Sequence, residues 1–290
     1  MIIDAHYHLD ERIEPVDTLI KKMGQASIDK TALIATPVEP FTVGRVAERL
    51  SGLIRKSLMS SFVWPGLLAY ISTVTKKGRF KVLNQTYAIY DNPDNKQVAS
   101  VLAAHPERFY GWIFVNPSFG DPIPEIERRR AEPGWIGVKC HPFWHRYALN
   151  RLDAAASYCE AHGLPLLVHL GAFRARGDFT YLPERYPGLK VIYAHAGIPY
   201  YRSLWAAIRS QENVYVDLSS PYLDASLRRV AIKTLGAHKC VYGSDGPYGY
   251  HDKDGGYDHR AILREIDGLP LSIVDKEKIL SGNFRELISK

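Results

Sequence analysis

The chain has 290 residues, of which 46% are hydrophobic and 23% charged, an ordinary composition for a globular protein with a sizeable core. Its three cysteines form no Cys-x-x-Cys pair, which argues against a disulfide framework and against a cysteine-based zinc site. No apolar run is long enough to cross a bilayer and no secretory signal is evident, so we expect a cytoplasmic protein without membrane association.

Eight short apolar runs rich in β-branched residues recur along the chain and predict strands. They are Ile2–His8, Thr31–Thr36, Phe109–Val115, Trp135–His141, Leu166–Leu170, Val191–His195, Val214–Leu218 and Cys240–Ser244. Amphipathic stretches between them predict helices, among them Leu152–His162, Ser203–Gln211, Ser226–Leu235 and His259–Asp267. Alternating strands and helices imply parallel strands with right-handed crossovers. Eight such units predict a (β/α)8 TIM barrel; an open doubly wound sheet is the alternative, although no Gly-rich phosphate loop follows the first strand.

The strand–helix rhythm breaks between Phe41 and Gln97. We interpret residues 41–97 as a helical insertion after the second strand, within a single barrel domain that spans residues 1–290. Between Thr42 and Lys81 the segment carries eight Lys and Arg residues against one acid, Glu48, and the whole chain has a formal net charge of +6. An anionic substrate, nucleic acid or a membrane surface could explain this charge, but we favour a solvated helical face. The insertion could form a lid, a substrate wall or a homodimer contact.

Histidine and aspartate side chains fall where five of the predicted strands end. They are His6 and His8, His141, His169, His195 and Asp245. The active site of a (β/α)8 barrel is built at the carboxyl ends of its strands. A single residue in such a place would mean little, but this many on one rim are not explained by packing.

The spacing of these residues fits a metal ion. Residues i and i+2 of a strand point to the same face, so His6 and His8 can both bind one ion. His169 and Asp245 come from strands on the far side of the ring. Three nitrogens and one carboxylate oxygen suit Zn²⁺, and imidazole also suits iron, nickel or cobalt. We therefore predict one divalent ion, with Zn²⁺ favoured.

Two further groups of residues face the same end of the predicted barrel. Asp217 and Ser219 point inward by strand parity and are candidates for residues that orient the ligands. Arg174 and Arg176 follow His169 in the next loop, where they could bind a substrate carboxylate or serve as surface charges.

Five motifs together resemble the amidohydrolase-related family. They are Asp4-Ala5-His6-Tyr7-His8, Gly137-Val138-Lys139-Cys140-His141-Pro142, Val168-His169, Ala194-His195-Ala196-Gly197 and Gly243-Ser244-Asp245-Gly246-Pro247. The resemblance is to the branch that contains aminocarboxymuconate-semialdehyde decarboxylase, resorcylate decarboxylases and several lactone hydrolases. It covers nearly the whole chain except the insertion, and it is specific for the family but weak for the substrate.

The resemblance implies roles for individual residues. His6, His8, His169 and Asp245 would be metal ligands, and His195 would be a catalytic histidine beside the metal. In a hydrolytic member, metal-bound water attacks a carbonyl, and Asp245 takes the water proton and passes it to the leaving group. His195 or the metal then stabilises the developing oxyanion.

Lys139 is ambiguous under the same resemblance. Some members of the superfamily carry a carboxylated lysine on the fourth strand that bridges two metals, and Lys139 shares a strand face with His141. A second metal is therefore an alternative to the single ion. Otherwise Lys139 is a structural cation or one that anchors the substrate.

We predict a metal-dependent hydrolase that uses a metal-activated water on a small-molecule amide, ester or lactone. A non-oxidative decarboxylase with the same metal site is the alternative, and no motif separates the two. A TatD-like deoxyribonuclease would suit the basic charge, but it expects a glutamate where Lys139 stands and Glu-Thr-Asp where Gly243-Ser244-Asp245 stands. A non-catalytic metal-binding barrel is disfavoured by the presence of His195 and Asp245. The expected partner is a small molecule, anionic or neutral, and not nucleic acid.

Overall fold

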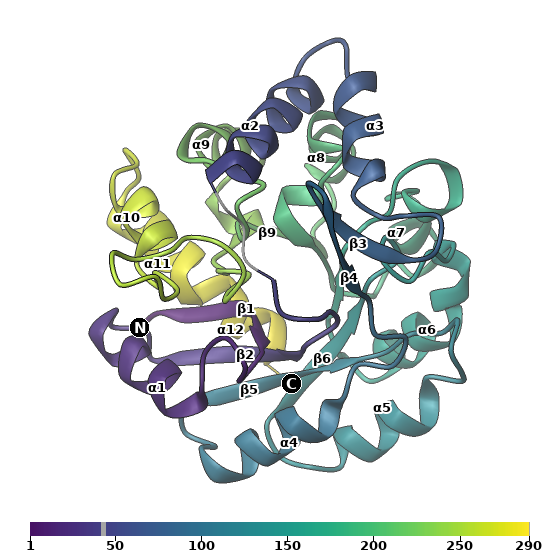
Figure 1. Ribbon diagram of the computed structural model, residues 1–290. Coiled ribbons are helices and arrows are strands. Elements are labelled where there is room, and N and C mark those ends of the chain that lie inside the picture. The colour runs from purple at the N-terminus through teal and green to yellow at the C-terminus, as the bar shows by residue number, and fades with distance from the viewer. Residues whose placement is uncertain (42–44, 290) are drawn as a thin grey trace.

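Eight parallel strands form one sheet that curls into a barrel (Figure 1). The computed structural model describes residues 1–41 and 45–289, excluding the side chains of residues 45–49 and 174. The strands in barrel order are β1 (Ile3–Leu9), β2 (Lys30–Ala35), β5 (Phe109–Phe114), β6 (Trp135–Cys140), β7 (Leu166–Val168), β8 (Val191–Tyr193), β9 (Val214–Asp217) and β10 (Cys240–Val241). All eight predicted strands are present, and the predicted (β/α)8 barrel is confirmed.

The barrel closes between β1 and the segment that contains and follows β10. The backbone N–H of Ala5 donates to the Tyr242 carbonyl at 3.0 Å, and the N–H of His8 donates to the Gly246 carbonyl at 2.7 Å. The buried carboxylate of Asp4 accepts the N–H groups of His6 and Ser244, at 3.1 and 3.0 Å. This seam fixes the first and the last barrel strand relative to each other, at the end where the candidate site lies.

Helices cover the outside of the barrel (Figure 1). They are α1 (Val16–Gln25), α4 (Asn95–Ala104), α5 (Ile123–Arg130), α6 (Asp153–Ala161), α7 (Tyr181–Arg185), α8 (Tyr201–Ile208), α9 (Ala225–Leu235), α10 (Ala261–Asp267), α11 (Ile273–Glu277) and α12 (Asn283–Ile288). Local sequence sets their starts: Asp224 caps α9 by accepting the N–H of Leu227. None of the described helices combines the length and the apolar character that a membrane span requires.

The insertion contains more than helices. Helices α2 (Arg45–Met59) and α3 (Trp64–Ser72) are followed by an antiparallel hairpin of β3 (Arg79–Val82) and β4 (Gln85–Ala88), which the sequence analysis did not foresee. Leu83 in the turn has a φ of 53°. The hairpin places the ring of Phe80 4.9 Å from Phe41 and 5.1 Å from Trp144, measured between ring centroids. These aromatic contacts between distant segments stabilise a strand pair that local periodicity does not reveal.

Two glycines give a matched test of barrel packing. A Cβ on Gly137 in β6 would lie 2.4 Å from the Pro165 carbonyl oxygen and 2.6 Å from the Trp112 ring, whereas a Cβ on Gly24 in α1 would meet nothing within 4 Å. We expect Gly137→Ala to lower the free energy of unfolding by about 1–3 kcal/mol through overpacking. Gly24→Ala should leave it unchanged or raise it by about 0.5–1 kcal/mol. Urea denaturation checks both, and equal stabilities of the two variants would contradict the packing described for β6.

Candidate metal centre

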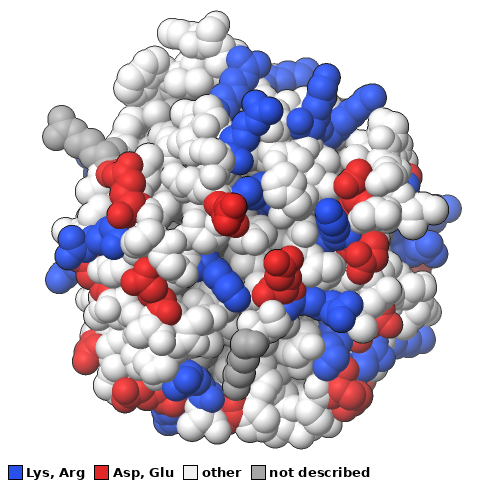
Figure 2. Space-filling model, turned by 180° about the vertical axis from the view of Figure 1, so that it is seen from behind, with Lys and Arg blue, Asp and Glu red and all other residues white. Residues whose placement is uncertain are grey.

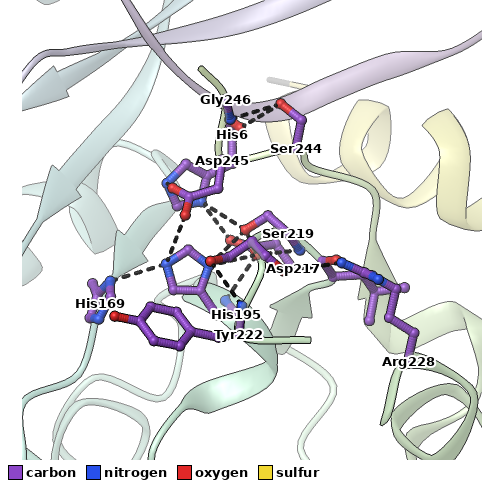
Figure 3. A network of polar contacts seen from close by, with 12 residues as sticks. His6, His169, His195, Asp217, Ser219, Tyr222, Arg228, Ser244, Asp245 and Gly246 are labelled. Carbon is purple, nitrogen blue, oxygen red and sulfur yellow. Dashed lines mark hydrogen bonds and ion pairs between the residues drawn. The ribbon is translucent and has the colours of Figure 1, made fainter. Parts of the chain in front are cut away.

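Three histidines surround Asp245 at the carboxyl end of the barrel, and a fourth, His169, contacts one of them. Figure 3 labels Asp245 with His6, His169 and His195. Asp245 Oδ1 lies 3.4 Å from His6 Nε2 and 3.4 Å from His8 Nε2, and its Oδ2 lies 3.8 Å from His195 Nε2. His195 Nε2 in turn lies 3.1 Å from His169 Nδ1. The four imidazoles are between 1% and 5% exposed. The structure therefore places the four predicted ligands, His6, His8, His169 and Asp245, at one end of the barrel.

Asp217, at the end of β9, fixes two of these rings. Its Oδ2 accepts the Nδ1–H of His6 at 2.8 Å, and its Oδ1 accepts the Ser219 hydroxyl at 2.5 Å. Because an ionised carboxylate can only accept, the single hydroxyl proton of Ser219 is committed to Asp217. Ser219 Oγ must then accept from His195 Nδ1, which lies 2.8 Å away. His6 and His195 therefore both carry a proton on Nδ1 and turn Nε2 towards Asp245.

The backbone at His195 is held in an uncommon conformation. His195 and Ala196 have φ values of 53° and 54°, in the left-handed region that non-glycine residues rarely adopt. The N–H of His195 donates to Asp217 Oδ1 at 2.9 Å, and the Ala196 carbonyl accepts the Trp205 indole N–H at 2.8 Å. The turn after β8 thus aims the imidazole across the barrel mouth, and Asp217 holds both its backbone and its ring.

His169 is held by a residue that sequence reasoning missed. Its Nε2 lies 2.7 Å from the hydroxyl of Tyr70, which comes from α3 of the insertion. The ring also stacks on His141, with centroids 4.0 Å apart. The aromatic content of the insertion was the one signal for Tyr70 in the sequence, and no spacing links it to His169.

Burial sets the charge state of the site. It lowers the pKa of His8 and of His195 to about 4, and it lowers the pKa of His169 well below its usual value, so these imidazoles are neutral at pH 7. Burial alone would raise the pKa of Asp245, but its interactions with His195, His8 and His6 outweigh burial and hold the pKa below the usual range. Three neutral imidazoles, those of His8, His169 and His195, therefore lie at the site together with the carboxylate of Asp245.

This donor set fits a divalent metal ion. His6 Nε2 and His8 Nδ1 are buried and have no hydrogen-bond partner among the described residues, a costly state for a polar atom unless a ligand satisfies it. Two nitrogens bound tetrahedrally to Zn²⁺ lie about 3.3 Å apart, close to the separations around Asp245. Among the described residues, the group whose ligand atoms all lie within 4.8 Å of one another is His6, His195 and Asp245. His8 and His169, two of the four predicted ligands, fall outside this group. His195, predicted to lie beside the metal as a catalytic residue, is thus within reach of it.

Of the two predicted substrate-binding residues, Lys139 and Arg174, the structure describes the side chain of Lys139 alone. Lys139 on β6 is fully buried, and its Nζ has no hydrogen-bond partner among the described residues. Burial lowers its pKa to about 8, partly opposed by Asp217 and Asp245. The side chain of Arg174 lies outside the described residues, so its role stays a prediction.

A cavity of about 550 Å³ opens above the candidate metal centre. His8, His141, His169, His195 and Asp245 line its floor. Phe41 and Tyr248 stack at 4.6 Å on one wall, and the insertion contributes apolar side chains such as Leu53, Ile54 and Val82 to the rest. The sequence left three roles open for the insertion: a lid, a substrate wall or a homodimer contact. The structure shows it as a wall of the cavity.

Comparison with known families shows the family of this chain. A family model described as amidohydrolase matches residues 71–288, well over half of the chain. The chain belongs to the amidohydrolase family. The resemblance seen in the sequence motifs is thereby confirmed, and the protein is an enzyme of the amidohydrolase superfamily. No curated protein matches the sequence.

Solved structures share the barrel of this amidohydrolase at low sequence identity. The 5-carboxyvanillate decarboxylase from Sphingomonas paucimobilis has a TM-score of 0.61 and 15% identity, covering 99% of this chain and 98% of that chain. A probable 2-pyrone-4,6-dicarboxylic acid hydrolase from Acinetobacter baumannii, with citric acid bound, has a TM-score of 0.63 and 16% identity over 99% and 98%. A dihydroxybenzoic acid decarboxylase from Polaromonas sp. JS666, with manganese and 2-nitroresorcinol bound, has a TM-score of 0.58 and 16% identity over 99% and 96%. At these identities the likeness shows the fold.

The buried neutral histidines predict a loss of stability in acid. Their pKa values are lower in the folded chain than the ordinary value of 6.5, so between about pH 6.5 and 4 the unfolded chain binds more protons and the free energy of unfolding falls as pH falls. For His195 the expected loss is about 3 kcal/mol. Urea denaturation of chelator-treated protein at pH 7.5 and 4.5 measures it. His195→Gln should shrink the loss and the exposed-site variant His162→Gln should not; a pH-independent wild type would contradict the account.

Proposed function

We propose that this amidohydrolase is a metal-dependent hydrolase that cleaves an amide, ester or lactone bond in a small molecule. The observation that carries the proposal is the position of Asp245. Its carboxylate, ionised because its pKa is held low, faces nitrogens of three histidines, and its side chain is 15% exposed on the floor of the cavity. A carboxylate placed in this way can serve both as a ligand and as a base.

His6, His8, His169 and Asp245 would hold one divalent ion, with Zn²⁺ favoured by the nitrogen-rich donor set and His195 within reach. A bound ion supplies a Lewis acid that lowers the pKa of water and polarises the carbonyl of the substrate. Asp245 takes a proton from the attacking water. His195 Nε2, held as an acceptor and 3.8 Å from Asp245 Oδ2, receives that proton next. The resulting N–H then donates to the developing oxyanion or to the leaving group.

The cavity walls favour a small, largely apolar substrate. Among the described residues that line the cavity, Lys81 is the one Lys or Arg, and it is exposed. An anionic group of the substrate would meet Lys81 rather than a buried cation. On the face turned away from the view of Figure 1, Lys and Arg are interspersed with Asp and Glu over the middle and lower parts, while a small group of Lys and Arg lies at the top (Figure 2). This mixture supports a small-molecule partner over nucleic acid.

A non-oxidative decarboxylase is the second candidate. The stacked rings of Phe41 and Tyr248, with an interplanar angle of 8°, form an aromatic surface on one wall of the cavity that suits a planar substrate. Two of the similar solved structures are decarboxylases of carboxyvanillate and dihydroxybenzoic acid. The products distinguish the two reactions, since a decarboxylase releases carbon dioxide and cleaves no amide, ester or lactone.

Turnover of a substrate panel by metal-loaded protein tests the proposal. With lactones, esters, amides and aromatic carboxylates as substrates, we expect hydrolysis that chelators abolish. Asp245→Asn should lower kcat/KM by about 10²–10⁴-fold, because it removes the base. Asp254→Asn, which changes an exposed carboxylate outside the cavity lining, should leave kcat/KM unchanged. Carbon dioxide release without hydrolysis would move the assignment to the second candidate, and turnover that survives chelation would contradict both.

Three further expectations from the sequence stay predictions: a second metal ion, a cytoplasmic location and a homodimer. A second ion would need Lys139, whose unpartnered Nζ lies inside the barrel, to be carboxylated. A cytoplasmic location agrees with the free thiols of the three cysteines. A homodimer through the insertion is supported by its exposed apolar side chains, Leu53, Phe62, Trp64 and Leu68. Light scattering tests the dimer, since the monomer mass is 32.7 kDa and a dimer has twice that value.

A further inference from the structure

Tyr70 reaches the metal centre from the insertion rather than from the barrel. Its side chain is fully buried, and its ring stacks on Phe143 with centroids 4.4 Å apart and an interplanar angle of 12°. Its hydroxyl lies 2.7 Å from His169 Nε2. Tyr70 does not line the cavity, so it acts on a bound substrate only through His169.

The position of the proton on the His169 ring can be inferred from the position of the proton on His195, because the two rings are in contact. His195 Nε2 has a lone pair, because Ser219 holds its proton on Nδ1. In the absence of an ion, His169 Nδ1–H can donate to that lone pair across 3.1 Å, and the Tyr70 hydroxyl can donate to His169 Nε2. An ion bound at Nδ1 needs the other tautomer, in which Nε2–H donates to the oxygen of Tyr70. A hydroxyl can donate or accept, so Tyr70 satisfies His169 in both states.

We propose that Tyr70 is a positioning residue of the metal centre. It holds the Nε2 side of His169 so that Nδ1 presents its lone pair to the ion. The insertion would then complete the metal centre as well as form a wall of the cavity. This inference rests on the proposed metal-dependent function.

The remaining contacts of His169 do not replace this hydrogen bond. Among the described residues no other hydrogen-bond partner is found for His169 Nε2. The stack on His141 fixes the plane of the ring but does not choose between its two tautomers. Because Tyr70→Phe keeps the ring that packs on Phe143 and removes one oxygen, it separates the hydrogen bond from the packing.

The test measures Zn²⁺ affinity by competition with a chromophoric chelator. Partners that orient metal-bound histidines contribute about 10–100-fold to metal affinity, so we expect a loss of that size in Tyr70→Phe. Tyr193→Phe is the matched control, because Tyr193 is equally buried and its hydroxyl donates to the Phe179 carbonyl at 2.6 Å, away from the metal centre. Its affinity should stay within about twofold of wild type, well below the loss expected when an orienting partner is removed.

A second readout reports on His169 directly. In the Co²⁺-loaded protein, the visible absorption bands should shift in Tyr70→Phe and not in Tyr193→Phe, because only the first changes the orientation of a ligand. In ¹⁵N-histidine NMR of the Zn²⁺-loaded wild type, His169 should carry its proton on Nε2. This measurement can overturn the proposal even if Tyr70→Phe does not fold.

The outcomes separate this proposal from the proposed function. A wild type that binds the ion, with unchanged affinity and Co²⁺ bands in Tyr70→Phe, would overturn the role of Tyr70 alone. A wild-type His169 that binds the ion through Nε2 would do the same. A wild type that binds no Zn²⁺, Mn²⁺ or Co²⁺ would overturn the metal-dependent function together with it.

Discussion

The carboxylate of Asp217 is the constraint on which the rest of the site depends. It accepts four hydrogen bonds, from the ring of His6, the backbone of His195, and both the backbone and the hydroxyl of Ser219. These contacts fix the tautomers of two histidines and hold His195 in a left-handed conformation. Arg228, which is buried on α9 and labelled in Figure 3, stabilises the segment that follows β9. Its guanidinium donates to the carbonyls of Leu218 at 2.8 Å and Ser220 at 3.1 Å. One buried carboxylate thus fixes the orientation of side chains that would otherwise rotate freely.

The barrel and the insertion contribute different things to this set. Strand ends place His6, His8 and Asp245 on one rim, and the seam between β1 and the segment around β10 keeps them in register. The insertion covers the rim, provides much of the cavity wall and delivers the hydroxyl of Tyr70 to His169. The low dielectric that results keeps His8, His169 and His195 neutral and strengthens each polar contact. Family membership fixes the fold and the class of enzyme.

The residues that could be predicted from the sequence are those that regular secondary structure places. Parity along a strand was enough to put His6 and His8 on one face, and it also turned Asp217 and Ser219 inward, where they contact His6 and His195. Two features could not be predicted in this way. The left-handed turn at His195 depends on a hydrogen bond to a residue 22 positions away, and the contact of Tyr70 with His169 joins segments 99 positions apart. Local periodicity carries no information about such contacts, nor about the β3–β4 hairpin.

The central claim is that one divalent ion binds among His6, His8, His169 and Asp245, with His195 within reach. The most direct measurement is anomalous X-ray diffraction from crystals of Zn²⁺-loaded protein, with data collected on both sides of the zinc absorption edge. The account predicts one strong anomalous peak per chain, about 2.0–2.2 Å from its nitrogen and oxygen ligands and in contact with Asp245 and His6 Nε2. A peak elsewhere on the chain, or none at the barrel mouth in protein saturated with Zn²⁺, would contradict it.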